Sequence, residues 1–252
     1  MLLATAKNHF TQDIQRSNDL VTHAATIPEG MLQSDIYRAS WMMAVGACDA
    51  YFCDAYTDLI SRALRAKDLE PAIEIPDRLN NLRVPVTAIL RQAHGGWRWR
   101  MAARELMEDE NVLSLDKVRA LFNHFFRKTH KLLNQDTIEP WIIHRSARSR
   151  MFGITATQYR AMAPQDRSKA RKEAIERFEE HFSEIFQRRH DCIHNCDRPK
   201  IALQPVSAGK VIKVIADVEF LVSRCHEALV GEFPEYMRGL GFGAVTRNQV
   251  LQ

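Results

Sequence analysis

Apolar residues recur every three or four positions along most of this chain, which is the spacing of an amphipathic helix. Strand-like alternation is hard to find, and glycine is scarce, with 10 glycines in 252 residues. The pattern therefore predicts an all-α protein, a helical bundle whose long helices share one large core.

The pattern predicts three long helices that would form this bundle. The first runs from about Leu3 to Ala25, before a Pro-Glu-Gly turn. The second begins near Ser34 and continues past Leu64 with a long apolar stripe, so we expect it to be a central packing element. Another starts near Pro164, where a proline suits the first turn.

Capping residues predict further helices. Ser114 can cap a helix that runs toward Leu133, and Thr155 with Gln158 forms a capping-box pattern for a short helix. Ser114, Thr155 and Gln158 each lie at or just before the start of an apolar run. We therefore expect helices to start at 114 and at 155.

A final amphipathic helix is expected from Ser207 to about Val230. The region 66–160 is interpreted as an insertion or as additional helices between the second and third core helices. The prediction is one domain over 1–252.

Charge and cysteine content narrow the class of protein. The net charge is +4, and residues 141–200 hold 13 Lys/Arg against 8 Asp/Glu, which would suit an anionic partner. The five cysteines have no disulfide-framework spacing, and no signal pattern is present, so we expect a cytoplasmic protein. The longest apolar run, Trp41 to Cys48, is too short to cross a membrane.

The segment RRHDCIHN, residues 188–195, is the best candidate for chemistry. It places two arginines, two histidines, a carboxylate and an amide near a predicted helix end. The apolar stripe of this helix continues through Phe178, Phe182 and Ile185 to Arg189, so we expect an arginine in a core-facing position.

This segment resembles the HEPN superfamily, most closely its RiboL-PSP branch, in which an arginine and a polar residue are followed by a histidine, with four to six residues between the arginine and the histidine. Arg189, His190 and His194 occupy those places. The second helix is similar to the arginine-led helix of the family, with Arg38 at its start and Asp49 midway. The resemblance covers roughly 34–66 and 165–230 and implies an HEPN-like bundle.

The resemblance implies a homodimeric, metal-independent endoribonuclease that leaves 2′,3′-cyclic phosphate and 5′-hydroxyl ends. The residue types fit that reaction, because an imidazole such as that of His194 can transfer protons near neutral pH. The guanidinium of Arg189 can hold the charged phosphorane. The resemblance also implies that Asp49, or alternatively Asp54, orients this pair, and that the protein acts as a toxin or in antiviral defence.

Helix geometry adds a constraint on this pair. Positions 189 and 194 lie about 140° apart on a straight helix. Either the helix unwinds before Asn195, or two chains meet about a twofold axis and combine their motifs. The HEPN resemblance favours the dimer.

Contacts with RNA phosphates are expected from basic and amide side chains. The candidates are Arg38, Arg188, Asn195, Arg145, Arg148 and Arg150.

Other interpretations of these residues remain open. Arg189 could simply form an ion pair with Asp49, and the arginine–histidine spacing also fits Arg16 with His23. The alternation of His190, Cys192, His194 and Cys196 suggests zinc, but on a helix the two pairs point apart, so we expect no metal and no cofactor. Cys196 stands where HEPN toxins that pair with nucleotidyltransferase antitoxins have tyrosine, which argues against an antitoxin of that class. The resemblance still implies some antitoxin or regulatory partner. A non-catalytic RNA-binding or protein-interaction module is the alternative function.

Overall fold

Helices make up every regular element that the computed structural model describes. The structure describes residues 1–80, 97–105, 107, 112–198 and 202–252. Within these ranges there is no strand, which confirms the all-α prediction. The same ranges contain no helix long and apolar enough to cross a membrane.

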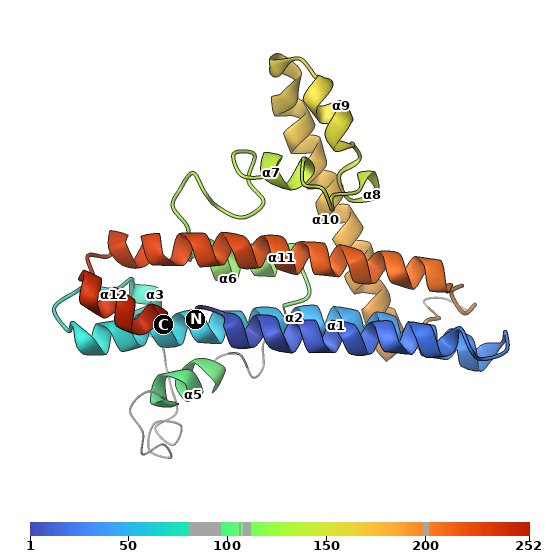
Figure 1. Ribbon diagram of the computed structural model, residues 1–252, viewed down its shortest axis with the longest axis horizontal. Coiled ribbons are helices and arrows are strands. Elements are labelled where there is room, and N and C mark those ends of the chain that lie inside the picture. Colours follow the sequence, from blue (N-terminus) through green and yellow to red (C-terminus); the bar gives the residue numbers. More distant parts are fainter. Residues whose placement is uncertain (81–96, 106, 108–111, 199–201) are drawn as a thin grey trace.

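Three long helices form an elongated bundle (Figure 1). They are α1 (Ala4–Ala24), α2 (Met31–Leu69) and α11 (Ala208–Gly239), and they lie side by side. Helix α2 is central because α1, α11, α5 and α12 all pack against it. It carries apolar or small residues around most of its circumference, as expected for a buried helix. Its largest fully buried side chains are Tyr51, Phe52, Leu59 and Ile60.

The bundle is closed at one end by α12 (Ala244–Leu251), a helix that the sequence did not predict. The two chain termini lie next to each other at this end (Figure 1). Arg62 of α2 holds them there, since it donates hydrogen bonds to the carbonyl groups of Val250 and Met1.

Helix α10 (Pro164–His194) crosses the bundle, and its first half projects away from it (Figure 1). Three short helices pack around this projecting half: α7 (Glu139–Ile142), α8 (Ser149–Phe152) and α9 (Ala156–Ala161). We call residues 139–180 the lobe. The predicted capping box of Thr155 and Gln158 is confirmed at the start of α9.

Aromatic side chains join the lobe to the bundle. Phe178 is fully buried and stacks on Phe152 with 4.9 Å between ring centroids. Its ring also meets Trp141 and Phe220, the latter on α11. Such ring contacts add to the free energy gained by burying apolar surface, so the lobe and the bundle share one core.

Two predicted helix ends were wrong. The helix that Ser114 caps is α6 (Leu115–Phe122), followed by the 3-10 turn η1 (Asn123–Phe125), and it does not approach Leu133. The chain folds back here because the Asn123 side chain accepts a hydrogen bond of 2.8 Å from the Leu132 amide.

Helix α11 continues nine residues beyond the predicted end at Val230, although Pro234 lies inside it. Proline cannot donate to the carbonyl four residues earlier, but that carbonyl belongs to Val230, which is 37% exposed. Phe233 and Met237 are fully buried beyond the break, and this burial keeps the chain helical.

The region 66–160 also contains α3 (Asp77–Asn80) and α5 (Trp97–Glu105). Helix α5 packs on α2. Part of the expected insertion, residues 81–96, 106 and 108–111, lies outside the described residues. That this region is an insertion therefore stays a prediction.

Candidate functional site

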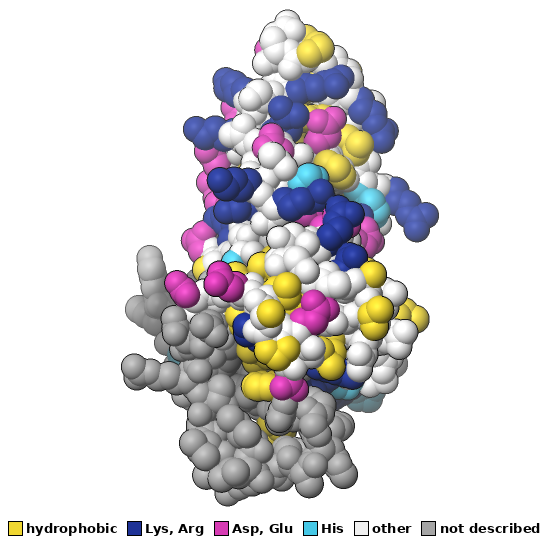
Figure 2. All heavy atoms as spheres, turned by 90° about the vertical axis from the view of Figure 1, so that its left-hand side faces the viewer, with side chains coloured by type: hydrophobic (Ala, Val, Ile, Leu, Met, Phe, Trp, Pro, Cys, Tyr) yellow, Lys and Arg dark blue, Asp and Glu magenta, His cyan; other side chains and the backbone are white. Residues whose placement is uncertain are grey.

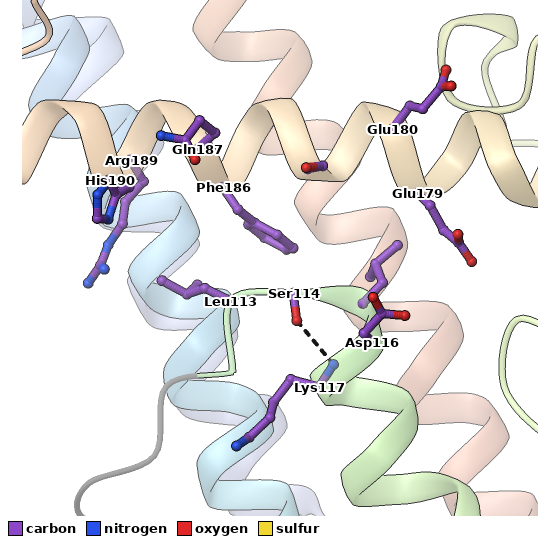
Figure 3. Close-up of a pocket in the computed structure, with 12 residues that line it drawn as sticks. Leu113, Ser114, Asp116, Lys117, Glu179, Glu180, Phe186, Gln187, Arg189 and His190 are labelled. Atoms are coloured by element: carbon purple, nitrogen blue, oxygen red, sulfur yellow. Dashed lines mark hydrogen bonds between the residues drawn. The ribbon is translucent and has the colours of Figure 1, made fainter. Parts of the chain in front are cut away.

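Residues 179–190 of α10 border a hollow of about 650 Å³, which Arg189 and His190 line (Figure 3). The opposite wall is the segment from Leu113 to Lys117, which leads into α6. Arg189 and His190 lie at one end of the hollow and Glu179 and Glu180 at the other, while the Lys117 side chain points away from α10 (Figure 3). The guanidinium of Arg189 therefore makes one end of the hollow basic.

His190 and His194 form a pair of exposed imidazoles one turn apart. Their ring centroids are 4.3 Å apart with an interplanar angle of 40°. The hydrogen-bonded helix continues to His194 without unwinding. Arg189 and His194 therefore remain about 140° apart around the helix axis, with His190 between them. One chain alone does not point Arg189 and His194 into one cleft.

Arg188, not Arg189, is the arginine buried in the core. Arg188 is 5% exposed, its guanidinium lies 4.9 Å above the Trp41 ring, and it donates 2.9 Å to Oδ2 of Asp197. Arg189 is half-buried at the edge of the hollow, and Ile193 is 46% exposed. The predicted core-facing position was thus one residue too late along the helix.

Asp197 also binds Arg38 of α2, whose Nε donates to the same Oδ2 at 2.7 Å. Arg38 is 7% exposed, Asp197 is fully buried, and the Gln204 carbonyl accepts 2.8 Å from Arg38 Nη2. Two arginines on one carboxylate fasten α2, the end of α10 and the segment before α11 to one another. We call Arg38, Arg188 and Asp197 the buried ion cluster.

The expected RNA contacts of Arg38 and Arg188 were wrong, because a phosphate cannot reach guanidiniums that are buried and already bonded to Asp197. The sequence singled out both arginines but missed the carboxylate. Asn195 remains exposed at the end of α10, with its side-chain amide 3.5 Å from Asp191.

The chain leaves α10 through two consecutive left-handed residues, Cys196 with φ 49° and Asp197 with φ 58°. Neither is glycine, so this conformation costs free energy. The amide of Asp197 donates to the Asp191 carbonyl at 2.9 Å, and its carbonyl accepts from the Gln204 amide at 3.0 Å. These bonds and the buried ion cluster hold the strained turn that follows the histidine pair.

Asp49 lies beside the same hollow and holds its wall. Its Oδ1 accepts 2.8 Å from the amide of Val112, the residue before Leu113. Burial raises the pKa of Asp49, while the Val112 amide and the nearby Arg189 partly oppose this shift. Among the described residues no direct ion pair joins Asp49 to Arg189, and their attraction acts at longer range through the pKa of Asp49. Asp54, the alternative acid, instead binds His9 on α1 at 3.1 Å.

We predict that the free energy of unfolding of Asp49→Asn increases, relative to that of the native chain, as pH rises. A carboxyl whose pKa is raised in the folded state stabilises below its unfolded pKa, and the stabilisation is lost as pH rises through the folded pKa. Asparagine keeps the acceptor for Val112 without the buried charge. Urea unfolding of both proteins from pH 3.5 to 7 measures the difference, and a difference that falls with pH would contradict the assignment.

The expected phosphate ligands before and within α8 have two different environments. Arg145 and Arg148 are exposed or nearly so, and in the described residues neither has an acidic partner. Arg150 is committed to Asp217, with Nε to Oδ2 at 2.9 Å. Figure 2 shows Lys and Arg side chains gathered over the lobe, interspersed with Asp and Glu, above a less charged bundle end.

The structure offers no support for a zinc site. In the part of the chain that it describes, no three His, Cys, Asp or Glu side chains are placed to hold a metal ion. Burial and the nearby Asp197 raise the pKa of Cys192 to about 11, so its thiol stays protonated. A protonated thiol is a poor metal ligand and a poor nucleophile.

Sequence reasoning did not place three residues of this region near the site: Lys117, Asp197 and Trp41. Lys117 follows the correctly predicted cap at Ser114, so its position at the start of α6 was a usable signal. No protein-family model matches this chain, and no match was found among curated proteins or solved structures. The interpretation of the site therefore depends on its residues and their geometry.

Proposed function

We propose that this protein is a metal-independent endoribonuclease of the HEPN type. One observation carries the proposal: a guanidinium and an imidazole, those of Arg189 and His190, line one hollow at the end of α10, and His190 contacts the exposed imidazole of His194 one turn further on. The buried ion cluster directly behind them fixes that end of α10 against α2. Fixed charges beside a reacting phosphate stabilise a transition state most effectively.

In this mechanism an imidazole removes the proton from a ribose 2′-hydroxyl, and the 2′-oxygen attacks the adjacent phosphorus. The bond from phosphorus to the 5′-oxygen breaks, and that oxygen receives a proton from an imidazole. The products are a 2′,3′-cyclic phosphate and a 5′-hydroxyl. Arg189 holds the phosphorane oxygens through paired hydrogen bonds.

His194 supplies the proton-transfer group, and its position requires a second chain. Because α10 is unbroken, Arg189 of one chain and His194 of another form one cleft when two chains pair about a twofold axis. His190 lines the hollow beside Arg189 and contacts His194, so it helps to position the His194 imidazole. Asp49 positions the wall of the hollow through Val112. A role as a toxin or in antiviral defence, with an antitoxin or regulatory partner, follows from the HEPN resemblance.

The test is cleavage of total RNA and of a labelled RNA strand in excess EDTA, with the product ends typed. We expect cutting that survives EDTA, cyclic phosphates at the 3′ ends, and 5′-hydroxyls that a kinase can label. The double variant Arg189→Ala, His194→Ala should not cut. The control is Arg177→Ala, His23→Ala, which removes the same residue types from exposed positions elsewhere.

Equal cutting by both double variants would disprove the assignment of the site. Tight RNA binding without any cutting by the native protein would instead favour a non-catalytic RNA-binding module with the same fold.

A further inference from the structure

Two adjoining hollows lie on the other side of α10, between that helix, α11 and the loop 144–150. Their volumes are about 570 and 700 Å³, and Arg150 and Asp217 line both. We call the continuous recess that they form the α11 groove. The proposed site does not use it.

A buried carboxylate holds the middle of the α11 groove. Asp217 is 1% exposed and binds Arg150 twice, at 2.9 and 2.5 Å. Oδ2 of Asp217 also lies 2.9 Å from Nε2 of His181 on α10. Asp217 therefore fixes one arginine and one histidine where the two hollows meet, which links the loop, α10 and α11.

Basic residues follow one face of α11 along the groove. Lys210, Lys213, Asp217, Phe220 and Arg224 are spaced three and four apart, which places them in one row. From Lys210 to Arg224 this row is about 21 Å long at 1.5 Å per residue. In the described ranges neither lysine has an ion-pair partner, so their charges are available to a ligand.

The opposite wall adds further basic side chains, and positive charge exceeds negative charge in the groove. Besides Arg188, which is buried on Asp197, six Lys and Arg residues and five Asp and Glu residues line the two hollows. Three of the five acids are engaged within the groove region: Asp217 with Arg150, Glu227 with Arg224, and Asp191 with side-chain amides. The six basic residues are Arg145, Arg148, Arg150, Lys210, Lys213 and Arg224.

The groove leads toward the candidate active site. Ser183 and Gln187, both exposed on α10, line the hollow of Arg189 and also the α11 groove. A strand that lies in the groove can therefore pass over these two small or neutral side chains and reach Arg189 without meeting a buried barrier.

We propose that the α11 groove binds the phosphate backbone of single-stranded RNA and guides it to Arg189, an inference that builds on the proposed function. The two aromatic rings that line the groove, Trp41 and Phe220, are 3% and 5% exposed, so bases cannot stack on them. Recognition is then through phosphates and depends little on sequence. We expect a flexible single strand to enter the recess and a rigid duplex to meet only its rim.

Binding is tested with a labelled single-stranded 2′-O-methyl RNA oligonucleotide, read by fluorescence anisotropy. This probe has no 2′-hydroxyl, so it reports binding whether or not the protein is a nuclease. We expect Lys210→Glu, Lys213→Glu to weaken binding by about 10- to 100-fold, since two phosphate contacts become repulsions. The control Lys169→Glu, Lys172→Glu has the same charge change and spacing on exposed α10 and should bind like the native protein.

A salt titration adds an independent readout. With Lys210→Gln, Lys213→Gln, the slope of log K against log salt should fall in magnitude by about 1.4, or about 0.7 for each lost contact with a single strand. Equal binding by the groove and control variants, or tighter binding of duplex than of single strand, would overturn the proposal. If the lysine variants bind RNA more weakly but the native protein never cuts RNA, the groove proposal stands and only the nuclease proposal is rejected.

Discussion

Replacing Asp197 with alanine is expected to lower the free energy of unfolding by about 3–5 kcal/mol, because it leaves two buried arginines without their shared carboxylate. Arg38 and Arg188 are 7% and 5% exposed, so water cannot replace the lost partner. The same change removes the anchor of the left-handed turn after α10. Urea unfolding at pH 7 followed by circular dichroism measures the loss.

Asp35→Ala provides the matched control for this prediction. Asp35 also binds Arg38, at 3.1 Å, but it is exposed on the first turns of α2. An exposed pair contributes about 0–1 kcal/mol, so this variant should unfold nearly as the native chain does. If both aspartate variants cost the same, the buried ion cluster does not anchor α10 as we describe.

Arg189→Ala and His194→Ala should each reduce RNA cleavage by about 10²- to 10⁴-fold, the usual contribution of a charge-stabilising or proton-transferring side chain. Mixing the two inactive proteins should then restore activity. A mixed dimer contains one cleft that lacks both groups and one cleft that has both, so random pairing recovers about one quarter of the native rate.

The mixing experiment separates a cleft shared by two chains from a site within one chain. A site within one chain stays inactive after mixing, since every chain lacks one group. The control mixes Arg189→Ala with the double variant Arg189→Ala, His194→Ala, which cannot rebuild a complete cleft. Recovery in that control would contradict the shared-cleft arrangement, and no recovery in either mixture would place both groups in a site within one chain.

Helix starts were predictable from the sequence because their signals are local. The capping box at Thr155, the cap at Ser114 and the proline at the start of α10 all act within one turn of chain. Helix ends were harder. α11 passes Pro234 because of burial further along the chain, and that burial depends on helices far away in sequence.

The candidate site was predictable only in part for the same reason. The cluster of arginine and histidine at the end of α10 is visible as a motif, but which arginine faces the core depends on the exact packing angle against Trp41. Asp197 binds Arg38 across 159 residues, and no spacing rule reports such a contact. The different partners of the two candidate acids, Val112 for Asp49 and His9 for Asp54, are likewise contacts between distant segments that no local pattern reports.

The length of α10 has a mechanical consequence. It is one unbroken helix of 31 residues, about 46 Å long, with the lobe at one end and the histidine pair at the other. A helix that long behaves as a stiff rod, so a tilt of about 5° displaces one end relative to the other by about 4 Å. A partner that grips the lobe therefore has leverage over the distance between Arg189 and the wall at Leu113, without touching either residue.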